Sequence, residues 1–391
     1  MNDHKKKSLS VFLVAFVIRI VAAIITTVTN LNPDSTADAV TFGQTAEMIA
    51  RGIFNGHPYI FTPRKPSPLD LLIPFGDGLI FELWGSLLAP FWMLPGPSGF
   101  YARFANAFLG AFAIYNLYLI ARHLHSHQAG VVSALPMMFY PSFIATHSTL
   151  LREAVVLFGI TSAVRLLIIP SNQRSKRLKY VLASVLLYAA FILRTDNAII
   201  YVSAIGSALV VQAVESGYVS KQVVGTGVIL SPIAFILSLP VLRDGVQFLA
   251  RTRELRTKGR AVYLPEIVPR TILELMAFSW VGAAYFLYAP FPWMIETIPD
   301  VLIGLEGMIN IGFTVMAVWG ARSLGQKDTS VTIGLLIGFG IGIVLYGVGT
   351  GNYGTGMRHR QMFLWVIFLF GGVGFAEYAK IKCCSNKKPI I

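Results

Sequence analysis

Four groups of ionisable residues have the types that transfer of a group from a phosphate requires. The groups lie far apart in the chain: Asp38, Arg152–Glu153, Arg194 with Asp196, and Arg358–His359–Arg360. An arginine guanidinium is a planar fork that can bind two oxygens of a phosphate leaving group. A carboxylate can act as the base toward a hydroxyl or amine acceptor. We therefore expect Asp38 to be the catalytic base.

The other members of these groups would hold the phosphate or support the residues that hold it. The expected phosphate ligands are Arg152, Arg194, Arg358 and Arg360. Glu153 and Asp196 would orient those arginines or bind the transferred group, and His359 would be a further supporting residue. The glycine-rich stretch 347–356 precedes Arg358, and exposed N–H groups in such a stretch can cradle a phosphate.

The composition places these residues in a membrane protein. Of the 391 residues, 55% are hydrophobic and 13% are charged, and the mean hydropathy is +0.64. A soluble domain carries roughly a quarter charged residues, and a disordered chain is far less apolar, so both classes are excluded. The net charge of +13 would suggest nucleic acid in a soluble protein. Here we expect it to reflect membrane topology, with no nucleic-acid partner.

Apolar stretches predict an all-α bundle of about ten membrane spans, or up to about twelve if short or broken helices also cross. We treat 1–391 as a single integral-membrane domain. The predicted spans cover about 9–29, 101–121, 129–147, 150–169, 180–193, 197–214, 222–241, 299–320, 331–349 and 361–378. Two further stretches, 75–94 and 270–289, are doubtful because they contain acidic residues and end in prolines.

The positions of lysine and arginine orient the bundle, because cytoplasmic loops carry an excess of both. If 75–94 and 270–289 do not cross, the basic cluster at 174–179 falls inside, together with both termini. Nearly all of the net charge then lies on the inner side. The extracytoplasmic loops would cover 30–99 and 242–293, and the four ionisable groups would share the outer face.

The first loop and a later helix start contain motifs in a fixed order. Asp38 follows the first helix, an amphipathic stretch ends at Gly52, and Lys65-Pro66-Ser67-Pro68-Leu69 comes after a spacer. Further along, Tyr140-Pro141-Ser142 precedes Leu151-Arg152-Glu153. This series resembles the polytopic GT-C glycosyltransferases that use lipid-phosphate sugars. Protein O-mannosyltransferases and lipid A aminoarabinose transferases belong to that group.

The resemblance implies that interfacial helices in the first loop lie over the bundle, and that the active site lies between these helices and the bundle. It implies transfer of a sugar from a polyprenyl-phosphate donor to a glycan, lipid or protein acceptor, on the extracytoplasmic face of a prokaryotic plasma membrane. Lys65 would support that site. Ala39 follows Asp38 where the family has a second acidic residue, so a divalent metal is possible and is not required by the motif.

Two other functions stay open on the sequence. A surface-polysaccharide polymerase or ligase would also use outer arginines, and the segment 251–256 contains three. A lipid or solute transporter would need broken helices or charges near the middle of the membrane. Apart from Arg19 and Arg165, the predicted spans contain few charges near their centres. Because the ionisable groups gather at one face, glycosyl transfer is the favoured reading.

Overall fold

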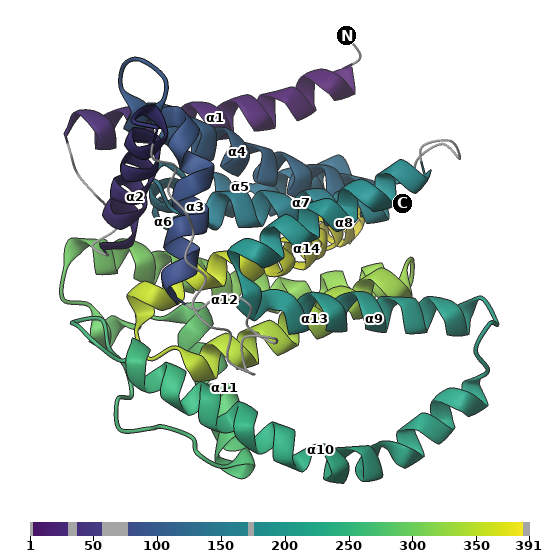
Figure 1. The fold of residues 1–391 in the computed structure, drawn as a ribbon. Coiled ribbons are helices and arrows are strands. Elements are labelled where there is room, and N and C mark those ends of the chain that lie inside the picture. Colours follow the sequence, from purple (N-terminus) through teal and green to yellow (C-terminus); the bar gives the residue numbers. More distant parts are fainter. Residues whose placement is uncertain (1–2, 30–36, 57–76, 171–175, 386–391) are drawn as a thin grey trace. The chain divides into compact units, whose positions relative to one another are not determined.

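The computed structural model describes residues 3–29, 37–56, 77–170 and 176–385. In these ranges the chain forms fourteen α-helices and two short 3-10 helices (Figure 1). The extended pairing found there is one isolated bridge between Val262 and Asn352. The predicted all-helical architecture is therefore confirmed for this part of the chain.

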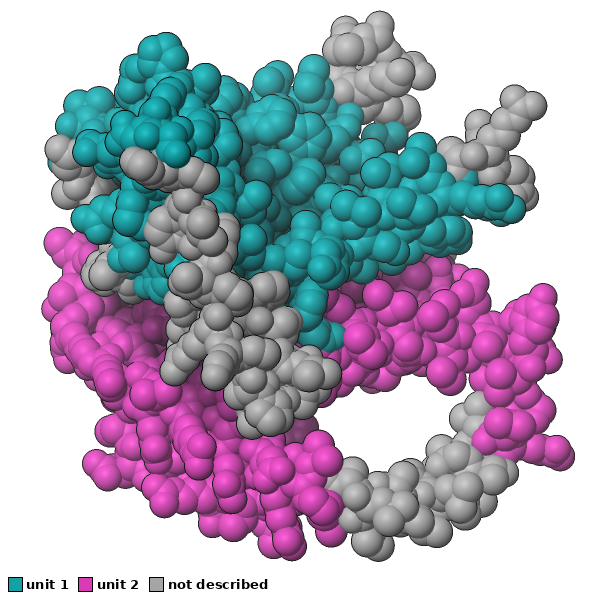
Figure 2. Space-filling view, in the orientation of Figure 1, with its two compact units in different colours: residues 1–198 teal, residues 199–391 magenta. Residues whose placement is uncertain are grey.

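The chain divides into two compact units, 1–198 and 199–391, which Figure 2 shows in different colours. Unit 1 contains α1 (Asp3–Val28), α2 (Ala37–Phe54), α3 (Asp77–Trp92), α4 (Ser98–Leu124), α5 (His127–Phe139), α6 (Pro141–His147), α7 (Glu153–Ile168), α8 (Lys176–Leu193) and η3 (Thr195–Asn197). Unit 2 contains α9 (Ala198–Glu215), α10 (Lys221–Arg256), α11 (Ile272–Tyr288), η4 (Pro292–Met294), α12 (Ile298–Gly325), α13 (Thr329–Gly349) and α14 (Tyr353–Ser385). The first residue of α9 belongs to unit 1.

Six of the described helices are long and apolar enough to cross a membrane, which indicates an integral membrane protein. They cover Lys7–Val28, Ser98–Leu124, Thr195–Glu215, Ile298–Gly325, Thr329–Gly349 and Tyr353–Ile381. The helices α5 and α6 form a seventh candidate that is bent by 68°. The other predicted spans fall on α7, α8 and α10, which are also helical. The count of ten spans stays a prediction.

Unit 1 is assembled around α4, and its contacts use aromatic rings and glycines. Phe12 and Phe16 on α1 pack against the rings of Phe104 and Phe108 on α4. A Cβ on Gly130 would lie 2.8 Å from the carbonyl oxygen of Tyr118, so α5 can approach α4 only because that residue is glycine. Small residues at such crossings are typical of helices that pack within a membrane.

The turn between α6 and α7, residues 148–152, interrupts the helices of unit 1. Upstream of it, Tyr140 has an extended backbone and Pro141 occupies the first turn of α6, which ends α5 and starts a new helix at an angle. The helical path is thus interrupted twice between α5 and α7, at Tyr140 and at the turn 148–152. The turn ends at Arg152, and Glu153 begins α7 directly after it.

Two helices, α2 and α3, fall within the predicted first loop and pack on each other. The buried stripe of α2 consists of Ala39, Phe42, Ala46, Ile49 and Ala50. Its spacing of three and four residues is that of one helix face. The Phe42 ring contacts the ring of Phe81 on α3 at 4.9 Å. That α2 and α3 lie at the membrane interface stays a prediction.

Unit 2 is organised around a close seam between α12 and α14. A Cβ on Gly320 would clash with the carbonyl of Phe370, and one on Gly374 would clash with the carbonyl of Met316. On the same seam, a Cβ on Gly371 would meet the backbone of Phe313. Backbone therefore packs directly on backbone along this pair, and α14 is buried along most of its length.

Candidate functional site

The turn between α6 and α7 is fixed by side chains from two other helices of unit 1. Asn106 on α4 donates hydrogen bonds to the carbonyls of Thr149, at 2.7 Å, and Leu151, at 2.8 Å. The Trp84 indole on α3 donates to the carbonyl of Leu150 at 2.7 Å. Irregular backbone is tolerated within a membrane protein only where such partners satisfy it. The turn is thereby held in one conformation, and it leads directly into Arg152 and Glu153.

A buried ion pair follows this turn. The Arg194 guanidinium lies 2.8 Å from Glu153 Oε1, and the two side chains are 4% and 0% exposed. Arg194 lies forty-one residues after Glu153 in the chain, so tertiary packing brings the pair together. Arg152 is half-buried and forms the N-cap of α7 without a side-chain capping bond. Two predicted phosphate ligands and one predicted supporting carboxylate therefore gather at the start of α7.

Asp38 lies in the first turn of α2 and is half-buried. Five residues further along α2, a Cβ on Gly43 would lie 3.0 Å from the Leu150 side chain. Five residues of helix rise about 7.5 Å, so the predicted base is within two helical turns of the contact with the α6–α7 turn. Asp38 thus belongs to the same unit as Arg152, Glu153 and Arg194, on a helix that packs against the turn before them.

Asp196 lies in η3, two residues after Arg194, and is exposed. Lys65 lies outside the described residues.

Arg19 is the most buried charge of unit 1, and its contacts were not foreseen. Its guanidinium donates to the carbonyls of Ala15 and Met137, at 3.1 and 2.6 Å, and to His147 Nδ1 at 3.3 Å. The Ser148 hydroxyl donates in turn to the Arg19 carbonyl at 3.0 Å. Because Nδ1 accepts a hydrogen bond, the His147 proton resides on Nε2. Arg19 therefore ties α1 to the last residue of α6 and to the turn that follows.

In unit 2 the predicted basic group lies in the second turn of α14. Arg358, His359 and Arg360 are 7%, 5% and 1% exposed. Arg360 donates to the carbonyls of Leu287 and Ala289, at 3.3 and 2.7 Å, and lies 3.7 Å from Glu306. These contacts bind α14 to the end of α11 and to α12. Arg360 therefore has a packing role, in addition to the phosphate role predicted for it.

The glycine-rich turn before α14 is not an open phosphate cradle. The N–H groups of Gly354 and Thr355 donate to the Asn352 side chain, at 2.8 and 3.2 Å. The N–H groups of Tyr353 and Gly356 donate to backbone carbonyls. Asn352 thus caps α14, and these four N–H groups are not open to a phosphate as the sequence predicted.

Arg253, in the segment that kept a polymerase or ligase open, is fully buried. Its guanidinium donates to the carbonyls of Ile267, Thr350 and Leu264, at 2.7, 2.6 and 2.9 Å. It also lies over the Phe278 ring at 4.8 Å. Arg253 therefore joins three segments of unit 2, and its guanidinium is directed into the protein.

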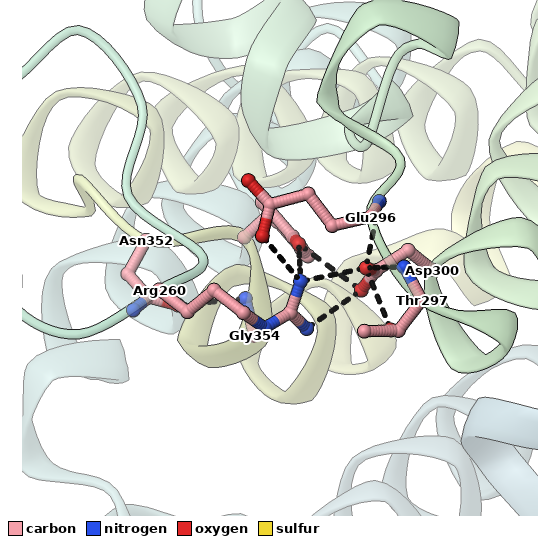
Figure 3. Close-up of polar contacts among 7 residues, drawn as sticks. Arg260, Glu296, Thr297, Asp300, Asn352 and Gly354 are labelled. Carbon is pink, nitrogen blue, oxygen red and sulfur yellow. Dashed lines mark hydrogen bonds and ion pairs between the residues drawn. The ribbon is translucent and has the colours of Figure 1, made fainter.

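A second polar cluster of unit 2 surrounds Asp300 (Figure 3). Arg260 binds both oxygens of this carboxylate, at 2.7 and 3.0 Å, and also pairs with Glu296 at 3.3 Å. The Thr297 N–H and hydroxyl and the Tyr353 hydroxyl donate to the same carboxylate. The bond to Asp300 raises the pKa of Arg260, which keeps this guanidinium charged. Nearby, burial raises the pKa of Tyr263 to about 12.

The sequence contained a signal for Asp300 that its interpretation passed over. Thr297 and Asp300 form a capping box, the reciprocal pair that opens a helix. The pattern of a threonine followed three residues later by an acid, before an apolar run, is visible in the chain. Arg260, by contrast, is forty residues away from Asp300 and is preceded by no recognisable pattern.

Among the residues that the structure describes, no group of three histidine, cysteine or acidic side chains is arranged to hold a metal ion.

No family model, curated protein or solved structure matches this chain.

Proposed function

We propose that this protein is an integral-membrane glycosyltransferase that moves a sugar from a polyprenyl-phosphate donor to an acceptor on the extracytoplasmic face. The observation that carries the proposal is the cluster at the start of α7. There a buried Glu153–Arg194 pair follows a fixed turn, and the helix that bears Asp38 packs on that turn. The ordered motifs of the first loop add to it.

In the proposed reaction, Asp38 accepts the proton of an acceptor hydroxyl or amine. The acceptor atom then forms a bond to the anomeric carbon of the sugar, and the bond from that carbon to the phosphate oxygen breaks. The polyprenyl phosphate leaves with the electron pair, and Arg152 and Arg194 stabilise its added negative charge. Glu153 holds the Arg194 guanidinium at 2.8 Å and so fixes its direction.

The test is transfer of labelled sugar in proteoliposomes from a panel of polyprenyl-phosphate donors, with and without a chelator. Asp38→Asn should lower transfer by about 10²–10⁴-fold, the usual contribution of a general base. Glu47→Gln is the matched control, because Glu47 is an exposed acid on the same helix, paired with Arg51. Near-normal transfer by a folded Asp38→Asn variant would contradict the proposal.

A transporter is the second candidate, because unit 1 contains the two features that such a protein needs. The helices α5 and α6 are bent by 68°, and Arg19 is fully buried within a candidate span. A flip-flop assay with a short-chain fluorescent lipid separates the two functions. If Arg19→Met stops flip-flop while Asp38→Asn leaves it unchanged, and no donor supports transfer, the transporter replaces the transferase.

A further inference from the structure

An apolar cavity of about 110 Å³ lies in unit 2 beside η4 and α12. Six residues form much of its wall: Phe291, Pro292, Ile295, Val301, Leu305 and Met308. Those on α12 recur at four and three residues, which places them on one face of the helix. Tyr288 also lines the cavity, and its hydroxyl already bonds Thr314 at 3.1 Å. The cavity therefore offers hydrocarbon and aromatic surface to a ligand.

Charged groups lie directly beside this wall in the chain. Glu296 follows Ile295, and Asp300 precedes Val301, so the cavity and the polar cluster of Figure 3 share one segment. The backbone N–H of Glu296 donates to the Asp300 carboxylate at 3.2 Å, and this bond fixes the segment from Glu296 to Asp300 in a turn. A ligand with an apolar part and a polar part would meet both kinds of surface.

The exposed edge of the cluster presents one donor and one acceptor to solvent. The Arg260 side chain is 47% exposed, and among the described residues its Nε–H has no acceptor, since its bonds use Nη1 and Nη2. The Glu296 side chain is 63% exposed, and its ion pair uses Oε2, which leaves Oε1 to solvent. A guanidinium and a carboxylate side by side are complementary to a ligand that itself carries both charges.

We propose that the cavity and this edge bind a phospholipid whose headgroup contains a phosphodiester and a primary ammonium. A short part of one acyl chain would occupy the cavity, the phosphodiester would accept from Arg260, and the ammonium would donate to Glu296. A purely anionic headgroup fits less well, because the cluster has two carboxylates and one guanidinium. A quaternary ammonium has no N–H to donate. The proposal does not depend on glycosyl transfer.

Trp293 supports the depth at which this headgroup would lie. It is 74% exposed and stacks on Phe291 at 4.9 Å, with the two rings 13° from parallel. Exposed tryptophans with an apolar face are typical of the membrane–water interface. The ring therefore marks the level at which acyl chains give way to headgroups.

The experiment is native mass spectrometry of the purified full-length protein with an equimolar mixture of three lipids of identical acyl chains. The probes are phosphatidylethanolamine, phosphatidylcholine and phosphatidylglycerol. Phosphatidylethanolamine should be retained about fivefold to tenfold more than either of the others, as one charge-assisted hydrogen bond provides. Equal retention of the three, or preference for phosphatidylglycerol, would overturn the proposal.

Two variants with matched controls assign the binding to this place. Glu296→Gln should abolish the preference for phosphatidylethanolamine, while Glu254→Gln, at an exposed acid paired with Arg270, should preserve it. Val301→Phe adds bulk to the cavity wall and should lower retention of phosphatidylethanolamine, while Leu302→Phe, at an equally exposed residue outside the wall, should not. If either variant behaves like its control, the lipid binds elsewhere and the proposal is wrong.

Discussion

The two units each place basic residues after an irregular turn, but the two turns are closed in different ways. In unit 1 the turn is held by Asn106 and Trp84 through its carbonyls, and the following helix has no side-chain cap from Arg152. In unit 2 the turn supplies its own cap, because Asn352 accepts from the N–H groups of the next helix. A glycine-rich turn before arginines is therefore no phosphate site when its own side chain occupies the N–H groups.

The arginines that gather at the helix starts after the two turns also differ in their contacts. Arg194 faces a carboxylate, Glu153, that lies at the start of a helix. Arg360 binds two carbonyls at the end of α11, with Glu306 at 3.7 Å. In the first arrangement the negative charge of Glu153 lies at a helix start, where an anion is stabilised. The second caps a helix C-terminus, where cations are favourable. The contacts of Arg360 are packing contacts, and the phosphate role proposed for Arg194 stays a proposal.

The largest expected effect is that of Arg194→Met, because it removes the Arg194 guanidinium from its buried ion pair with Glu153. Breaking a buried pair costs about 3–5 kcal/mol of unfolding free energy, measured as SDS-induced unfolding in mixed micelles. The double variant Glu153→Met/Arg194→Met should recover most of that stability and still fail to transfer sugar. Sugar transfer by the double variant would show that Arg194 has no role in phosphate binding.

A smaller loss is expected for Arg253→Met, which leaves several carbonyls of unit 2 without a donor. Unsatisfied buried acceptors should lower the unfolding free energy by about 2–3 kcal/mol, measured in the same micelles. Transfer per folded molecule should be unchanged. The control is Arg251→Met, at an exposed position of the same helix, which should be near neutral. Loss of transfer by folded Arg253→Met would make unit 2 more than a packing unit.

The smallest effect is expected for Asn352→Ala, which removes the cap of α14. Losing an N-cap costs about 1 kcal/mol. The KM for the polyprenyl-phosphate donor should stay unchanged, because the N–H groups of this turn serve the fold. A rise of KM with kcat unchanged would place donor binding at the glycine-rich turn of unit 2 instead of the turn of unit 1.

The helices were predictable, and most contacts of the candidate site were not. The predicted spans fall on helices, with 129–147 divided between α5 and α6, because apolar length and composition are local properties of the chain. Glu153 has an arginine beside it at position 152, so local spacing gives no reason to expect a distant partner. Its ion pair is with Arg194, and only tertiary packing brings that residue close.

Arg19 shows the same limit. An arginine in an apolar helix indicates a special role, but its partners are carbonyls of Ala15 and Met137 and the ring of His147. Carbonyl groups are present at every residue and so give no sequence signal. The predicted union of Asp38 and Arg194 with Arg358 and Arg360 at one outer face stays a prediction.

The glycine seam between α12 and α14 restricts how unit 2 can move during a working cycle. Since backbone meets backbone at Gly320, Gly371 and Gly374, sliding or rolling one helix on the other would drive side chains into spaces that hold only hydrogen atoms. The two helices must therefore travel as one rigid rod. A hinge of this unit has to lie outside that rod, and a cross-link between the paired helices should be silent in every functional assay.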